Sequence, residues 1–159
     1  MNKREISLCA IRTEKAIEII NKQIPMDKEV IKRVKQSLVK KGVELLQSEE
    51  LDIWLVSKGA EAVTFSSGTL IIMHTNVSAS GFFEELIHYG QVINGKTKDG
   101  DNENILLMEI DAKERLIKCR KPYKITDYEM GILTESLDWY KIKLNEARGE
   151  RGENVSNHC

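Results

Sequence analysis

Phe82-Phe83-Glu84-Glu85-Leu86-Ile87-His88-Tyr89-Gly90-Gln91 is the most informative stretch of this 159-residue chain. At the 100° step of an α-helix, its apolar residues cover most of the circumference. Glu84, His88 and Gln91 follow one another at spacings of four and three, so they share one narrow face, with Glu85 at its edge. A helix that is apolar on most sides is expected to be largely buried. A buried stripe of carboxylates and an imidazole is costly unless something compensates it, and a metal ion does so well.

The five residues from Glu84 to His88 correspond to a His-Glu-x-x-His motif in which glutamate replaces the first histidine. In that motif the two outer residues, one helical turn apart, bind the metal, and the inner glutamate is the general base for a metal-bound water. The spacing therefore predicts Glu84 and His88 as ligands and Glu85 as the catalytic residue. A solvent-facing helix with a modest Glu84–His88 pair has the same spacing, so the helical wheel leaves both interpretations open.

A site of this kind has three protein ligands and one open position. Glu109 is the best candidate for the third ligand, because it lies in the apolar run 105–110 and the residues at 105, 106, 108, 112 and 116 around it are apolar, which predicts that it faces inward. The alternative for Glu109 is a buried carboxylate bonded to a backbone amide or a lysine.

The ligand set predicts a divalent metal. Zinc accepts carboxylate oxygen and is expected first. Two glutamates neutralise the charge of the ion, which weakens its polarisation of water. More oxygen ligands also make manganese or iron more competitive. The chain is therefore expected to be a weaker or differently metallated hydrolase, or a domain that has lost peptidase chemistry.

The chain as a whole is typical of one soluble domain. Its formal net charge of −1 gives no general attraction to nucleic acid or to an anionic membrane. Its apolar runs are shorter than a membrane span, and its N-terminus lacks the apolar core of a signal peptide. We therefore expect it to be cytoplasmic when synthesised, with later export as an effector left open. Cys9, Cys119 and Cys159 are an odd number without close spacing, which argues against a disulfide framework or a cysteine zinc site.

Periodicity predicts a helix-rich α+β fold with a small β-sheet beside the motif helix. The expected helix N-caps are Asp27, Ser48 and either Ser78 or Ser80, and Thr126-x-x-Glu129 is the expected capping box of the last helix. A single domain is expected over residues 1–147, with N-terminal helices at 1–41 and a core at 42–147. The tail, 148–159, is polar and lacks periodicity, so it is predicted to be disordered. The expected helices are 7–23, 28–41, 48–58, 81–94, 104–120 and 126–147, and the expected strands are 43–46, 61–65 and 69–74.

From about Lys40 to Leu144 the sequence resembles the zincin-like metallopeptidase domains at the C-terminal ends of bacterial polymorphic toxins. The resemblance is carried by the hairpin segment 60–70, by 83–91, by 108–117 and by the last helix. It implies a zincin-like core in which Glu84, His88 and Glu109 bind the metal and Glu85 is the base. It also implies that the strand over 69–73 pairs with an extended substrate.

These observations predict a metal-dependent hydrolase, a zincin-type peptidase acting as a toxin effector on a protein or peptide substrate. An immunity protein is a further expected partner, and the basic helix 28–41 is one place where it could dock, although a solvated face explains those lysines as well. The alternative is a non-catalytic interaction protein on a degenerate zincin scaffold. His74 fits a strand-end histidine bonded to backbone better than a ligand. The sequence contains no glycine-rich phosphate loop and no nucleic-acid motif.

Overall fold

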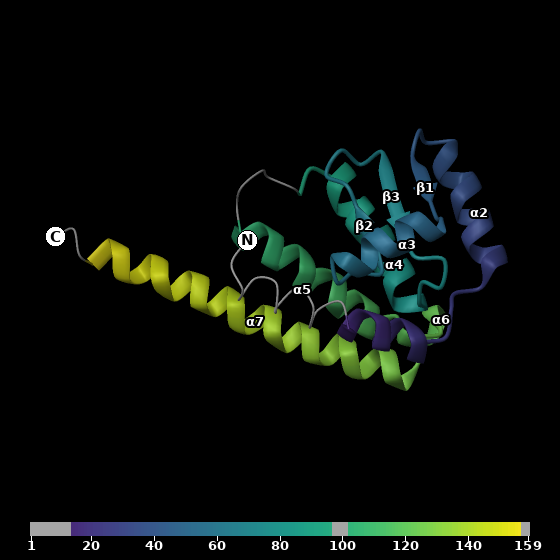
Figure 1. Ribbon diagram of the computed structural model, residues 1–159. Helices are drawn as coiled ribbons and strands as arrows, with labels where there is room; N and C mark the ends of the chain where they lie inside the picture. The colour runs from purple at the N-terminus through teal and green to yellow at the C-terminus, as the bar shows by residue number, and fades with distance from the viewer. Residues whose placement is uncertain (1–13, 97–101, 157–159) are drawn as a thin grey trace. The chain divides into compact units, whose positions relative to one another are not determined.

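The computed structural model describes residues 14–96 and 102–156 (Figure 1). The fold is helix-rich α+β with one small three-stranded sheet, as the sequence predicted. Contacts divide the chain into two compact units, Met1–Tyr89 and Gly90–Cys159, and helix α4 runs across the boundary. The single domain expected over 1–147 stays a prediction, because one domain can contain two compact units. No helix in the described part of the chain has the length and apolar character needed to cross a membrane.

Local capping chemistry sets most helix bounds in the first unit. Asp27 Oδ1 accepts a hydrogen bond from Glu29 N at 2.8 Å, and Ser48 Oγ accepts one from Leu51 N at 3.3 Å, which confirms both predicted caps. Gly42 and Gly59 follow two of the helices with positive φ. The elements are a helix over 14–22, then α2 (Lys28–Val39), β1 (Glu44–Leu46), α3 (Glu49–Ser57), β2 (Ala62–Thr64), β3 (Leu70–Met73) and α4 (Ala79–Ile93).

The sheet has the order β1-β3-β2, with β3 in the centre. β3 runs parallel to β1, with Leu45 opposite Ile71, and antiparallel to β2, with Val63 opposite Ile72. Both edges of β3 are therefore hydrogen-bonded within the sheet. The prediction that the strand over 69–73 pairs with an extended substrate is wrong, because β1 and β2 already occupy the two edges that a strand possesses.

The core of the first unit lies between the sheet and helices α2 and α4. Phe82 on α4 and Met73 on β3 are completely buried in it. Thr64 Oγ1 on β2 donates a hydrogen bond to the carbonyl oxygen of Glu85 at 3.0 Å. This bond joins the sheet to the motif helix and confirms that the two lie side by side.

The second unit contains the last turn of α4, then α5 (Asn102–Lys118), α6 (Arg120–Tyr123) and α7 (Asp127–Ser156). Figure 1 shows α7 alongside α5. Their antiparallel direction follows from the ion pairs Glu103–Arg148 at 2.8 Å and Glu114–Lys141 at 2.9 Å. The unit's core consists of Ile110, Leu137 and Leu144 with partly buried neighbours. The predicted capping box at the start of α7 is confirmed, with Thr126 and Glu129 exchanging hydrogen bonds.

Helix α7 continues to Ser156, whereas the sequence predicted disorder from 148 onward. The bond from Arg148 Nε to Glu103 Oε1 at 2.8 Å ties the beginning of this extension to α5. Residues 7–13 of the first predicted helix, the loop residues 97–101 and the tail residues 157–159 lie outside the described part of the chain.

Candidate metal centre

The motif helix α4 begins at a serine cap. Ser78 Oγ accepts a hydrogen bond from Gly81 N at 3.0 Å, which satisfies one of the free N–H groups of the first turn. The sequence predicted Ser78 or Ser80 in this role. One turn further along α4 come Glu84 and Glu85, and His88 follows one turn after Glu84.

The polar stripe on α4 is mostly shielded from solvent. The side chains of Glu84 and His88 are 16% and 12% exposed, and Glu85 is 8% exposed. These values exclude the alternative in which the stripe is the solvent-facing side of the helix. α4 carries two carboxylates and one imidazole but no lysine or arginine. Partly buried carboxylates of this kind favour a nearby cation.

The geometry of the pair suits a shared ion. His88 Nε2 lies 3.7 Å from Glu84 Oε1. Two ligand atoms that are each about 2 Å from one metal ion lie roughly 3–3.5 Å apart. Small side-chain adjustments therefore bring this nitrogen and this oxygen to the separation that one ion requires. Imidazole nitrogen with carboxylate oxygen is a donor set that zinc, iron and manganese all accept.

Glu85 is fixed at the sheet side of α4. Its carbonyl oxygen accepts the hydrogen bond from Thr64, and its side chain is buried. Glu85, the predicted catalytic residue, is thus a buried carboxylate next in sequence to Glu84, a predicted ligand.

Glu109 lies on α5, in the second unit. Its Oε2 is 3.7 Å from Lys113 Nζ, and the two side chains are 23% and 9% exposed. Lys113 Nζ also lies 5.7 Å from the ring centroid of Tyr140. The inward orientation predicted for Glu109 agrees with this partial burial. The ion pair also matches the alternative for Glu109, a carboxylate bonded to a lysine.

The stripe ends at Gln91, which is buried in the second unit. Its Nε2 donates to Met108 O at 3.1 Å and to Asp111 Oδ2 at 2.8 Å. Burial acts to raise the pKa of Asp111, but the hydrogen bonds from Gln91 and Arg115 and the positive charges of Arg115 and Lys96 together outweigh it, so the pKa is lowered. The side chain of Gln91 lines a cavity of about 330 Å³, together with Gly95, Lys96, Asn104, Leu107, Met108 and Asp111.

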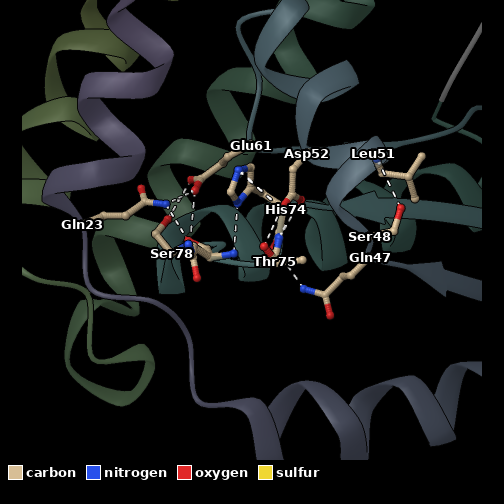
Figure 2. A network of polar contacts seen from close by, with 10 residues as sticks. Gln23, Gln47, Ser48, Leu51, Asp52, Glu61, His74, Thr75 and Ser78 are labelled. Carbon is tan, nitrogen blue, oxygen red and sulfur yellow. Dashed lines mark hydrogen bonds and ion pairs between the residues drawn. The ribbon is translucent and has the colours of Figure 1, made fainter.

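The sequence reasoning missed Glu61, which precedes β2. Its carboxylate accepts hydrogen bonds from Ser78 Oγ at 2.7 Å, from Ser78 N at 3.1 Å and from Gln23 Nε2 at 2.6 Å (Figure 2). Burial raises the pKa of Glu61, and the nearby charge of Glu84 raises it further, while the hydrogen bonds oppose both effects. The hydrogen-bond partners of Glu61 are 17 and 38 positions away in the chain, so local periodicity carries no signal for it.

His74 has the structural role that the sequence favoured. Its Nδ1 accepts a hydrogen bond from Asn76 N at 3.0 Å, and its Nε2 lies 3.7 Å from Asp52 Oδ2 (Figure 2). The accepted N–H bond requires an unprotonated Nδ1, so the proton of a neutral ring is on Nε2, facing the aspartate. His74 therefore joins the end of β3 to α3.

Comparisons of the chain with protein-family models, with curated proteins and with solved structures gave no match. The functional assignment therefore depends on the chemistry of α4 and of the residues around it.

Proposed function

We propose that this protein is a metal-dependent hydrolase, a zincin-type peptidase that acts as a toxin effector. The observation that carries the proposal is the shielded pair of Glu84 and His88 on α4, with the buried carboxylate of Glu85 beside it. The resemblance of this segment to the zincin-like domains of polymorphic toxins supports the same assignment. Glu84, His88 and Glu109 are the proposed ligands, each with one ligand atom for a divalent ion.

Glu109 is proposed as the third ligand on two grounds. It is a partly buried carboxylate in an otherwise apolar part of α5. In addition, Gln91 lies three residues after His88 on the same face of α4 and bonds to the carbonyl oxygen of Met108, the residue before Glu109. Lys113 competes with a metal for this carboxylate, because both are cations.

The proposed chemistry divides into binding and proton transfer. When bound, a divalent ion supplies Lewis-acid activation of water and of the scissile carbonyl group. Glu84 and Glu109 reduce the net charge of the site, which lowers the expected activity and admits manganese or iron beside zinc. Glu85 is the group proposed to accept the proton of the attacking water. The substrate is proposed to be a protein or peptide that binds by a route other than strand addition to β3, since both edges of β3 are paired.

The toxin assignment carries two further proposals. An immunity protein is the proposed partner in the producing cell. The chain is proposed to be made in the cytoplasm and exported as an effector.

Glu85→Gln is the sharpest test of the catalytic proposal. The glutamine keeps the size of the side chain but does not accept a proton at neutral pH, so toxicity and hydrolysis should fall by a factor of about 10²–10⁴. Metal content should remain that of the wild type, because Glu85 is not a proposed ligand. Glu114→Gln, on the exposed side of α5, is the control and should change neither property. Toxicity that survives Glu85→Gln at the wild-type level would contradict catalysis by Glu85.

The second candidate function is a non-catalytic interaction protein on a degenerate zincin scaffold. The Glu109–Lys113 ion pair favours it, because that pair compensates the carboxylate without a metal. This candidate predicts protein without bound metal and a thermal midpoint that chelator leaves unchanged. Metal-dependent stability that is lost on His88→Ala would exclude it.

A further inference from the structure

The segment between β3 and α4, residues 74–78, is held by hydrogen bonds from several other segments of the first unit (Figure 2). Because it leads directly into α4, these bonds determine where the motif helix begins. They are Gln47 Nε2 to His74 O at 3.0 Å, His74 N to Glu61 O at 2.8 Å, Thr75 N to Asp52 Oδ1 at 2.8 Å, Gln23 Nε2 to Asn76 O at 2.9 Å and Met26 N to Val77 O at 2.7 Å.

Glu61 holds the last residue of this segment. Both carboxylate oxygens take part: Oε1 accepts from Ser78 Oγ, and Oε2 accepts from Ser78 N and from Gln23 Nε2. Ser78 Oγ accepts in turn from Gly81 N. One carboxylate thus connects the residue after the helix at 14–22, the segment before β2 and the first turn of α4.

Gly81 provides a second, independent observation of the same contact. A Cβ atom at this position would lie 2.2 Å from Glu61 Oε1 and 2.5 Å from Glu61 Cδ. The carboxylate therefore lies directly against the first turn of α4, where the N-terminus of the helix also favours a negative charge. Only glycine permits this approach. At Gly90, on the same helix, an added Cβ would have open space.

We propose that Glu61 is a positioning residue, which fixes the start of α4 and thereby the locations of Glu84, Glu85 and His88. Its effect on a metal site rests on the proposed function, whereas its effect on α4 does not. Each residue of an α-helix advances 1.5 Å and turns 100°. Loss of the contact at the first turn therefore shifts or rotates all three side chains together, and a displacement of about 1 Å is enough to spoil a metal site.

Glu61→Gln separates hydrogen bonding from charge. The glutamine oxygen can accept from Ser78 N and Gln23 Nε2, while its amide donates to Ser78 Oγ, whose hydroxyl can reorient toward Ser80 Oγ at 3.1 Å. A positioning role therefore predicts that Glu61→Gln is tolerated and that Glu61→Ala is not.

Gly81→Ala displaces the carboxylate without removing it. Alanine ordinarily strengthens a helix relative to glycine, so a role in helix propensity alone predicts no loss. The positioning role predicts that Gly81→Ala behaves like Glu61→Ala. Gly90→Ala is the matched control on the same helix and should behave like the wild type.

The experiment measures zinc affinity by competition with a chelator, and amide hydrogen exchange along α4 in the metal-free protein, for the full chain and the four variants. Glu61→Ala and Gly81→Ala should weaken zinc binding by roughly 10- to 100-fold and speed exchange in the first turns of α4. Glu61→Gln and Gly90→Ala should stay within about threefold of the wild type.

Three results would overturn the proposal. Wild-type affinity and exchange in Glu61→Ala and Gly81→Ala would exclude positioning by Glu61. Equal losses in Glu61→Gln and Glu61→Ala would assign the effect to charge instead of hydrogen bonding. Exchange that is unchanged along α4 while affinity falls would also exclude positioning. If Glu61→Ala does not fold, the comparison of Gly81→Ala with Gly90→Ala still tests whether Glu61 positions α4. If the wild type binds no zinc, the proposed function fails, while the exchange data still decide the role of Glu61.

Discussion

Replacement of Lys113 by methionine should lower the free energy of unfolding of the metal-free protein and tighten its binding of zinc. Lys113 Nζ lies 3.7 Å from Glu109 Oε2, and both side chains are largely shielded from solvent. Methionine preserves much of the aliphatic stem but removes the positive charge, which lies 5.7 Å from the ring centroid of Tyr140. Without the ammonium group of Lys113 beside it, the carboxylate of Glu109 should bind a metal ion more tightly.

The distance between Lys113 Nζ and Glu109 Oε2 determines how large both effects should be. At 3.7 Å and an effective dielectric constant of about 20, the direct attraction is about 4 kcal/mol. Desolvation of both groups offsets much of it, and partial exposure of Glu109 reduces the remainder, so the expected loss in free energy of unfolding is about 1–3 kcal/mol. Removal of the competing cation should tighten zinc binding by about tenfold or more, since about 1.4 kcal/mol corresponds to a factor of ten.

Urea unfolding with and without zinc, together with a chelator competition assay, measures both quantities. Lys141→Met is the control, because it removes the exposed ion pair with Glu114 and should cost no more than about 1 kcal/mol without altering zinc affinity. Unchanged or weaker zinc binding in Lys113→Met would refute the assignment of Glu109 as a ligand. The Glu109–Lys113 pair would then be purely structural.

Two further predictions concern the first unit. Phe82→Ala should lower the free energy of unfolding by about 3–5 kcal/mol in chemical denaturation, because Phe82 is completely buried between α4 and the sheet; a loss below about 1 kcal/mol would contradict that packing. The raised pKa of Glu61 means that this carboxyl group binds a proton more strongly in the folded state than in the unfolded state. The free energy of folding that Glu61 contributes through this proton is therefore fully present below the ordinary glutamate pKa and is lost as pH rises through the raised pKa. The free energy of unfolding should therefore fall between the ordinary glutamate pKa and the raised pKa in the wild type, and it should fall less in Glu61→Gln. Identical dependence of stability on pH in the two proteins would contradict the raised pKa of Glu61.

Features that depend on neighbouring residues could be predicted from the sequence. The caps at Asp27, Ser48 and Thr126 join groups at most three residues apart, so a short stretch of sequence contains the whole interaction. The polar stripe on α4 could also be predicted, because the period of a single helix determines which side chains share a face, whereas its shielding from solvent was left open.

Features that depend on residues far apart in the chain could not be predicted from the sequence. The central position of β3 is determined by which strands pair, and strand periodicity does not identify a partner. Glu61 bonds to residues 17 and 38 positions away, so no local pattern marks it. The helical turns after residue 147 were missed because their polar sequence lacks an apolar stripe, although Arg148 has a partner on α5.

The most direct test of the metal assignment is the metal content of the protein purified without a histidine tag, equilibrated with zinc and dialysed. A metal site made of Glu84, His88 and Glu109 predicts about one zinc ion per chain in the wild type, little or none in His88→Ala, and a reduced content in Glu109→Gln but not in Glu114→Gln. Absence of zinc from the wild type, or equal zinc content in the wild type and His88→Ala, would contradict a metal site on α4.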